Sequence, residues 1–394
     1  MEATSTISDN QFGHKDGQGA DIRQRTNHKR WGQRGSAAIT FGSRMEFSDI
    51  HLSYDKVAAV RGVSFVLEPG EIVCLLGPSG CGKTSLLRLA AGAEQPDSGS
   101  VILDDRVVAG DGVFIPPEKR NVGLMFQDFA LFPHLSILDN VTFGLQDLDK
   151  KSARAEALLA LQRVGLADYG NKYPNELSGG EQQRVALART IVPRPSIVLM
   201  DEPFSGLDQR LRDSVRQETQ TLLKETRASA MIVTHDPLEA MGLADRILLM
   251  RDGRIIQTGT PSELYNHPQD LQVARFFCDF TEVPGTINDG VIDSPLGSFQ
   301  LEDEVSDGKA LMLIRPHAII ASPSKAGKLT GKVLQSRFLG EITELQVQFA
   351  ELDEVLIRAS TRKLPKPGDV MEFTVDNELV LIIASDGTHT HIKQ

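Results

Sequence analysis

The sequence predicts an α/β domain followed by a small all-β domain. Three short apolar runs, 72–76, 197–200 and 231–234, have the composition of parallel strands that are covered on both faces. From about residue 282, short β-rich runs alternate with Gly, Pro and Asp, which is typical of a small barrel. The 394 residues, 40% of them hydrophobic, suffice to bury one larger and one smaller core.

Composition and charge narrow the possible functions. No stretch approaches 18 uninterrupted apolar residues, so no membrane span is predicted. Cys74, Cys81 and Cys278 offer neither a disulfide framework nor a metal-binding spacing, which is consistent with a reducing cytoplasm. The net charge of −11 argues against a general nucleic-acid binder. If the protein works at a membrane, we expect a partner to recruit it.

A glycine-rich motif directly follows the run 72–76 and reads Gly77, Pro78, Ser79, Gly80, Cys81, Gly82, Lys83, Thr84. The spacing Gly-x4-Gly-Lys-Thr between a strand and a helix predicts a phosphate-binding loop, or P-loop. Its backbone N–H groups turn toward the phosphates, Lys83 reaches the β- and γ-phosphates, and the Thr84 hydroxyl is placed to ligate Mg²⁺. A helix is expected from Ser85 to Ala91, with its positive end facing the anion. The motif alone leaves kinases, GTPases, helicases and transport ATPases open.

Polar residues follow the other two predicted strands. Asp201 and Glu202 stand where open α/β sheets place their ligands. Asp201 suits the shell of Mg²⁺, and Glu202 suits the general base that polarises the attacking water, a role worth on the order of 10²–10⁴ in rate. His235 is placed to hydrogen-bond the γ-phosphate and so to distinguish ATP from ADP. The simpler alternatives are two solvated carboxylates and a structural histidine.

Two adjacent glycines directly precede a predicted helix at 181–190. Ser178 is a natural N-cap, and Glu181 three residues later completes a capping box. Gly179 and Gly180 leave backbone N–H groups uncovered at a positive helix end, which suits a second phosphate-binding surface. A capped helix without a ligand is the alternative.

Taken together, these motifs resemble the nucleotide-binding subunit of an ATP-binding-cassette (ABC) transporter across roughly 45–259. The resemblance implies an α/β P-loop NTPase (ABC ATPase) with a helical subdomain, which hydrolyses ATP with Mg²⁺. In that family the segment corresponding to 177–182 closes over the γ-phosphate held by the P-loop of a second subunit. The resemblance therefore implies a homodimer and adds to the nucleotide site the residues Ser178, Gly179, Gly180 and Gln182.

The same resemblance assigns three further residues. Tyr54 resembles the aromatic that stacks on adenine, and Gln127 resembles the glutamine that touches Mg²⁺ and the attacking water. Asp208, in Ser-Gly-Leu-Asp, resembles the aspartate of the loop that crosses the dimer interface. Alternatively, Tyr54 is a core residue, Gln127 a surface polar group and Asp208 an N-cap. The sequence departs from the family pattern at no catalytic position, so an active ATPase is expected.

Three regions are expected along the chain. Residues 1–44 are predicted to be disordered; a membrane-surface or partner-binding arm is an alternative, and translation starting at Met45 is another. The ATP-binding domain is expected at 45–281, with its helical subdomain at about 128–190 and a helix at 152–164. Residues 282–394 resemble the regulatory extension of import cassettes, an all-β oligonucleotide-binding-like (OB-like) module. From residue 285 onward sixteen Asp and Glu outnumber eleven Lys and Arg, so dimerisation or sensing is favoured over nucleic-acid binding.

The resemblance to importers also implies partners. These are two membrane-spanning permease subunits and a periplasmic or extracellular solute-binding protein, without nucleic acid. The protein would then be peripheral, on the cytoplasmic face of the inner membrane. The apolar residues of 126–145, which include Phe129, Leu131, Phe132 and Leu135, resemble the groove that receives a helix of the membrane subunit; the core of the helical subdomain is the alternative.

The cargo is predicted from resemblance alone. The segment 202–213 and the Phe-Gln-Asp-Phe run resemble ferric-iron importers, with polyamine, sugar, sulfate, molybdate and phosphonate systems as alternatives. No residue of this chain is expected to touch the cargo. Two other classes remain open, a soluble ABC-type ATPase without a transport role and a purely regulatory ATP-binding protein.

Overall fold

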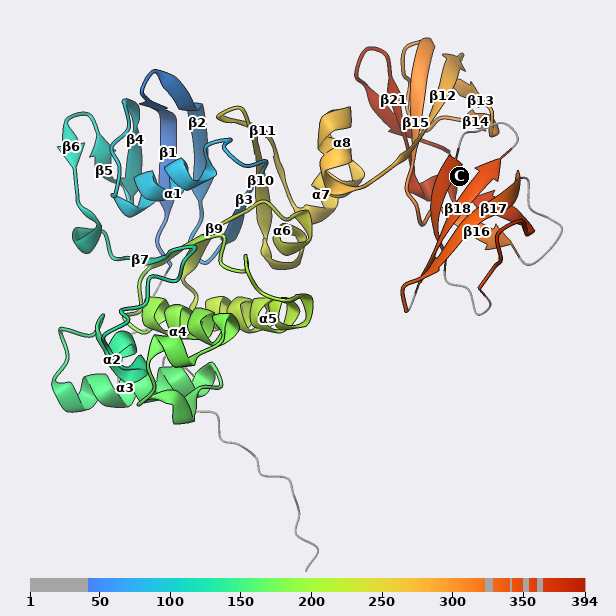
Figure 1. The fold of residues 1–394 in the computed structure, drawn as a ribbon. Coiled ribbons are helices and arrows are strands. Elements are labelled where there is room, and N and C mark those ends of the chain that lie inside the picture. Colours follow the sequence, from blue (N-terminus) through green and yellow to red (C-terminus); the bar gives the residue numbers. More distant parts are fainter. Residues whose placement is uncertain (1–41, 323–328, 341, 350–353, 360–363, 394) are drawn as a thin grey trace, which may run out of the picture. The chain divides into compact units, whose positions relative to one another are not determined.

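The computed structural model describes residues 42–322, 329–340, 342–349, 354–359 and 364–393 (Figure 1). The prediction of disorder for 1–44 therefore falls, except for its last three residues, outside the described residues. The cassette contains two sheets, and the C-terminal region contains two more.

The first sheet is antiparallel, in the order β2-β1-β4-β5-β6. Its inward side chains include Phe47 and Phe65, whose rings stack with centroids 4.4 Å apart. Such a pair adds roughly 0.5–1.5 kcal/mol to the free energy gained by burying its area. The strands are β1 (Met45–Tyr54), β2 (Val57–Leu67), β4 (Ser98–Leu103), β5 (Arg106–Gly110) and β6 (Val113–Phe114).

The second sheet is parallel except for its edge strand β11, and its order is β11-β10-β3-β9-β8-β7. The three predicted buried runs are its neighbouring strands β3, β9 and β8, which confirms their parallel character. Because these strands run in one direction, their carboxyl ends meet at one edge, where the polar residues follow. The strands are β3 (Ile72–Leu76), β7 (Val122–Met125), β8 (Ile197–Asp201), β9 (Ser229–Thr234), β10 (Arg246–Arg251) and β11 (Arg254–Gly259).

Helix α1 (Lys83–Ala91) packs into a hydrophobic core that both sheets share. It contributes Leu86 and Leu89, each fully buried, to the cluster that contains Phe47 of β1 and Leu75 of β3. The helix begins two residues before the predicted Ser85, directly after Gly82. Its first turn is therefore built from the last two residues of the glycine-rich motif.

The remaining helices confirm the predicted ones and add others. The predicted helix 152–164 is α3, and the helix at 181–190 lies within α4, whose capping box between Ser178 and Glu181 is present. The helices after α1 are α2 (Ile137–Thr142), α3 (Lys150–Arg163), α4 (Gly179–Ile191), α5 (Gln209–Thr226), α6 (Pro237–Leu243), α7 (Pro261–Asn266) and α8 (Leu271–Phe277).

The C-terminal region is all-β and barrel-like, as predicted. One antiparallel sheet has the order β14-β13-β12-β15-β21-β22 and the other β16-β20-β17-β18-β19, and residues of both form one core. The strands are β12 (Thr281–Asn288), β13 (Val291–Ser294), β14 (Gly297–Gln300), β15 (Gly308–Ile314), β16 (Ile319–Ser322), β17 (Leu329–Phe338), β18 (Thr343–Phe349), β19 (Glu354–Ala359), β20 (Val370–Val375), β21 (Val380–Ala384) and β22 (His389–His391).

The β-rich runs of the sequence, 310–314, 331–335, 344–349, 355–360, 370–375 and 379–383, correspond to β15 and β17–β21, whereas β12, β13, β14, β16 and β22 lie outside them. Most of these are only three or four residues long, and β12 contains Pro284 and Gly285, which weaken a strand pattern. Pairing with neighbouring strands, rather than local propensity, therefore determines them.

Candidate functional site

The P-loop joins β3 to α1. Its glycines at 77 and 82 have φ values of +154° and +104°, and a Cβ atom at either would lie 2.3 Å from a backbone oxygen. Lys83 is only 5% exposed. Its ammonium donates hydrogen bonds to the carbonyl oxygens of Gly77 (2.8 Å) and Pro78 (2.9 Å). The loop thus curls around its own lysine, whose ammonium is held by two carbonyl groups and the Cys81 sulfur.

The side chains beside this lysine differ in exposure. Cys81 is buried with its Sγ 3.8 Å from the Lys83 Nζ, and burial raises the pKa of the thiol. Ser79 and Gly80 are exposed. Tyr54 is 38% exposed and donates to the carboxylate of Glu94 at 2.7 Å. It is therefore not the core residue that one alternative proposed, since its ring is open to solvent at the end of β1.

Thr84 and Asp201 are brought together from segments 117 residues apart. The Thr84 hydroxyl donates to Asp201 Oδ1 at 3.2 Å. Burial raises the pKa of Asp201, although the bond from Thr84 opposes this shift. Hydroxyl and carboxylate oxygens are the hard ligands that Mg²⁺ prefers. No cluster of three or more His, Cys, Asp or Glu capable of holding a metal occurs in the described ranges, and Mg²⁺ commonly uses only one or two carboxylates together with phosphate.

Glu202 is the point where two further segments meet. His235 Nδ1 lies 3.1 Å from Glu202 Oε1, and Gln127 Nε2 donates to Glu202 Oε2 at 3.4 Å. The backbone of Glu202 has a φ of +43°, a left-handed conformation that costs a non-glycine residue of order 1–3 kcal/mol. Ser205 supports this turn by donating its hydroxyl to the Glu202 carbonyl oxygen at 2.9 Å. The structure thus unites the predicted base with two of its predicted partners.

The glycine pair at the start of α4 lies in two different environments. A Cβ atom on Gly180 would lie 2.1 Å from Leu211, whereas one on Gly179 would meet nothing within 4 Å. Ser178 caps the helix, and its hydrogen bonds to Glu181 lower the pKa of that carboxyl group. Gln182 donates to the backbone carbonyls of Pro174 and Leu177. These side chains bond within their own segment in the single chain, which leaves the face at Gly179 open.

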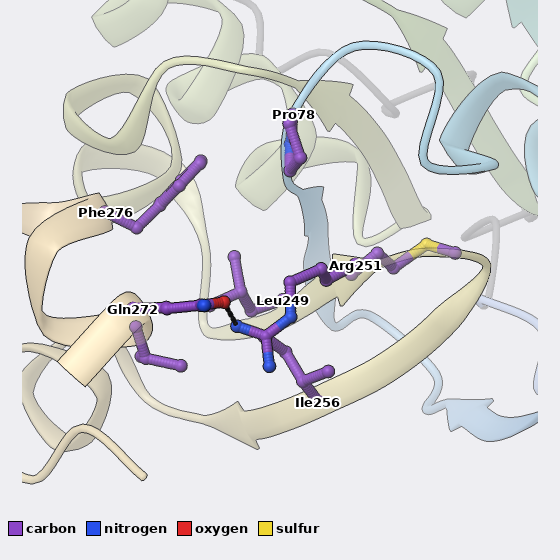
Figure 2. A pocket seen from close by; sticks show the side chains of 8 residues that line it. Pro78, Leu249, Arg251, Ile256, Gln272 and Phe276 are labelled. Carbon is purple, nitrogen blue, oxygen red and sulfur yellow. Dashed lines mark hydrogen bonds between the residues drawn. The ribbon is translucent and has the colours of Figure 1, made fainter. Parts of the chain in front are cut away.

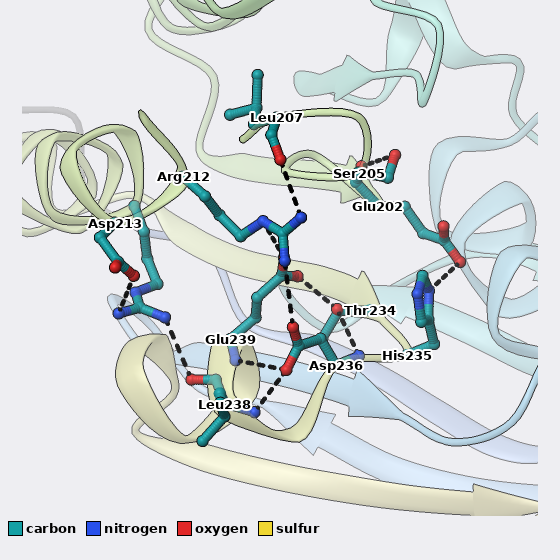
Figure 3. Close-up of polar contacts among 11 residues, drawn as sticks. Glu202, Ser205, Leu207, Arg212, Asp213, Thr234, His235, Asp236, Leu238 and Glu239 are labelled. Carbon is teal, nitrogen blue, oxygen red and sulfur yellow. Dashed lines mark hydrogen bonds and ion pairs between the residues drawn. The ribbon is translucent and has the colours of Figure 1, made fainter. Parts of the chain in front are cut away.

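Asp208 is the N-cap of α5 in the single chain. Its carboxylate accepts the N–H of Leu211 at 3.1 Å, which is the simpler role that the sequence left open. Four residues later, Arg212 reaches back to the carbonyl oxygen of Leu207 and across to the start of α6 (Figure 3). Sequence reasoning gave Arg212 no role, because its only local signal is its position one helical turn after the cap.

A pocket lies beside the P-loop, between β10, β11 and α8 (Figure 2). Its wall includes Pro78 and Phe276, and Arg251 is held there by Gln272 and Asp270. None of the residues that surround Glu202 lines it. The pocket thus touches the P-loop at Pro78 but does not extend to the residues around Glu202.

Across the described ranges of the chain, no helix combines the length and apolarity that crossing a bilayer requires.

The parallel sheet with a P-loop, facing carboxylates and a second glycine-led helix, defines the class of P-loop nucleotide-binding proteins. A family model described as "ABC transporter" matches residues 60–205, and a model described as "TOBE domain" matches 312–383. The chain belongs to the ABC transporter family, among its import ATP-binding proteins. It therefore binds ATP, as the resemblance indicated.

Curated relatives match most of the chain. A Fe(3+) ions import ATP-binding protein of Mesorhizobium japonicum is 38% identical over 85% of this chain and 98% of its own. A protein of the same name from Rhizobium etli is 40% identical, covering 82% and 93% of the two chains. A sulfate/thiosulfate import ATP-binding protein of Chromobacterium violaceum is 41% identical, covering 76% and 83%.

Solved structures match the cassette alone. The ATP-binding cassette MJ0796, in a dimeric post-hydrolysis state bound to ADP and Pi, is 29% identical to this chain, with a TM-score of 0.50. The match covers 55% of this chain and 98% of that one. Together with the family match, it confirms the predicted ABC ATPase fold and an ATPase coupled to transport.

Proposed function

We propose that this protein powers ferric-iron import by hydrolysing ATP on the cytoplasmic face of the inner membrane. The observation that carries the catalytic part is the meeting of His235 and Gln127 on the Glu202 carboxylate, next to the Thr84–Asp201 pair. These groups come from four separate segments. Their convergence at one sheet edge is what hydrolysis of a bound nucleotide requires.

The chemistry assigned to this edge is phosphoryl transfer to water, which depends on positioning and electrostatics. Lys83 exchanges its carbonyl partners for the β- and γ-phosphates. Thr84, Asp201 and Gln127 hold Mg²⁺, which neutralises phosphate charge when bound. Glu202 orients the attacking water and takes its proton, while His235 contacts the γ-phosphate.

We assign the remaining nucleotide contacts to the exposed face of the P-loop and to a second subunit. Tyr54 stacks on adenine, and the P-loop residues 77–85 surround the phosphates. Gly179 presents its open N–H face, with Ser178, to the γ-phosphate of the partner subunit. The homodimer is supported by the dimeric state of the cassette MJ0796. The regions 45–281 and 282–394 serve as the ATP-binding and regulatory domains.

The permease partner is assigned to the helical subdomain. Phe126 is 48% exposed and Phe143 50% exposed, and the ring of Phe143 lies 4.5 Å from that of the partly buried Phe132, measured between centroids. Exposed aromatic side chains around a partly covered one form a surface that suits an apolar helix. Two permease subunits would dock here, and a periplasmic or extracellular solute-binding protein would deliver the cargo to them.

The choice of ferric iron rests on relatives, because no residue of an ATP-binding subunit touches the cargo. The relatives from Mesorhizobium japonicum and Rhizobium etli, which cover most of both chains, are named for Fe(3+) import. Sulfate or thiosulfate is the second candidate, since a relative of that name is 41% identical.

Reconstituted vesicles test this proposal. The membrane complex that copurifies with this subunit is supplied with its solute-binding protein and with ferric iron or sulfate. We expect ferric iron to raise ATP turnover and sulfate not to. In the matched Glu202→Gln complex turnover should be lost while an ATP-bound dimer accumulates, because the carboxylate is replaced by an amide of the same shape. If the Glu202→Gln complex hydrolysed ATP as fast as the wild type, the general base would be another residue. If sulfate alone raised ATP turnover, sulfate and not ferric iron would be the cargo.

A further inference from the structure

Arg212 joins two segments that the proposed mechanism treats separately (Figure 3). Its Nη2 donates to the carbonyl oxygen of Leu207 at 3.0 Å, directly before Asp208. Its Nη1 lies 3.6 Å from the carboxylate of Asp236, directly after His235. One planar guanidinium thus spans the loop that precedes α5 and the turn that follows β9.

A buried carboxylate completes this contact. Glu239 is 5% exposed, and its Oε1 lies 3.9 Å from Arg212 Nε. Its other oxygen accepts the hydroxyl of Thr234 at 2.6 Å, and that hydroxyl in turn accepts the N–H of Asp236 at 3.1 Å. Burial raises the pKa of Glu239, and the Thr234 hydrogen bond and the nearby Arg212 cation oppose this shift. The turn that carries His235 is therefore tied to Arg212 by two routes.

We propose that Arg212 is a positioning residue that couples the Asp208 loop to His235, and through His235 to Glu202. The inference rests on the proposed function. In the proposed dimer, Asp208 faces the partner subunit, so closure there would pull on Leu207 and, through the guanidinium, on Asp236. Hydrolysis in one site would then depend on how the other site is closed.

Arg216 supplies a matched control on the same helix. It lies one turn further along α5, pairs with Asp213 at 2.9 Å and reaches Leu238 of α6 at 3.4 Å. Neither of these two contacts involves the Asp208 loop or Asp236. Arg216→Gln therefore removes an arginine that also joins α5 to α6 without cutting the proposed link.

The experiment compares Arg212→Gln, Arg212→Lys and Arg216→Gln in ATP titrations of the assembled transporter. We expect Arg212→Gln to lower kcat by on the order of tenfold to a hundredfold, with KM for ATP within about twofold, since misplacement affects the chemical step. The Hill coefficient for ATP should fall toward one. The kcat of Arg212→Lys should also be low, because a single lysine ammonium cannot reach all three partners of the guanidinium. Arg216→Gln should behave as wild type.

Besides a normal kcat in Arg212→Gln, two results would overturn the inference. One is full rescue by Arg212→Lys, which would reduce the role to charge balance near Glu239. The other is loss of the ATP-bound dimer when Arg212→Gln is added to Glu202→Gln, because Arg212 would then act on folding or assembly. If Glu202→Gln alone does not trap an ATP-bound dimer, the proposed function is wrong. If Glu202→Gln does trap the dimer but Arg212→Gln has a normal kcat, only the inference about Arg212 is wrong.

Discussion

At the scale of single residues, neighbouring glycines carry different constraints. Gly180 faces Leu211 of α5, so any side chain there collides with a packed helix. Gly179 faces open space, so packing within the chain gives no reason for its lack of a side chain. A glycine without a packing reason is explained by close approach of another group to its backbone. This contrast supports the assignment of Gly179 to a phosphate of the partner subunit.

Two alanine substitutions separate these roles. Gly179→Ala should keep or slightly raise the melting temperature, since alanine favours a helix by up to ~1 kcal/mol. ATP turnover should nevertheless fall, because a Cβ atom obstructs the N–H face. Gly180→Ala should cost about 1–3 kcal/mol by overpacking against Leu211. Thermal unfolding and ATP turnover measured on both variants check this prediction. Normal turnover in a stable Gly179→Ala protein would show that Gly179 does not form a second phosphate-binding surface.

At the scale of elements, the short strand β22 places two histidines beside the end of α7. The ring of His267 lies 5.6 Å from that of His391 and 6.4 Å from that of His389, measured between centroids. Burial, and then the two neighbouring histidines, lower the pKa of His389, while Asp303 opposes the shift. The folded state therefore prefers this imidazole neutral.

The sign of this shift sets a pH window for stability. Above about pH 6.5 the group is neutral in both folded and unfolded chains, so it contributes nothing. Below that value the unfolded chain binds the proton more readily, so stability falls until the pH passes the lowered pKa of folded His389. Melting curves between about pH 5 and pH 8 should show this loss, and His389→Gln should reduce it. His134→Gln, which changes an exposed histidine, serves as the control. If the melting temperature of His389→Gln fell with decreasing pH as steeply as that of the control, the prediction would be wrong.

At the scale of the whole molecule, we propose that neither phosphate-binding surface completes a site alone. The P-loop is built by β3 and α1, while the glycine-led helix α4 offers its open face elsewhere on the chain. A site shared between two subunits makes ATP binding and dimer closure one event. Defects in the two surfaces should therefore complement each other.

Mixed dimers test this shared site. Lys83→Ala and Ser178→Arg subunits should each be inactive alone, because each homodimer lacks one half of both sites. An equal mixture should recover about a quarter of the intact sites, since about half of the dimers are mixed and each holds one complete site. Turnover is measured before and after subunit exchange. A mixture that stays inactive, although mixed dimers form, would argue for sites contained within one chain.

Local sequence determined the parts of this protein whose physics is local. The strands β3, β8 and β9 follow from apolar runs that only a covered sheet accommodates. The P-loop follows from the spacing Gly-x4-Gly-Lys-Thr between a strand and a helix, and the α4 cap follows from Ser178 with Glu181. The order of these motifs along the chain also indicated the family.

Only the tertiary structure decided which side chains meet. Gln127 reaches Glu202 across 75 positions, and Arg212 reaches both Leu207 and Asp236, because sheet order and helix packing bring these segments to one edge. The same packing built short strands such as β22 that have little propensity of their own. Contacts between distant segments depend on the folded path of the chain, and no local pattern of residues encodes that path.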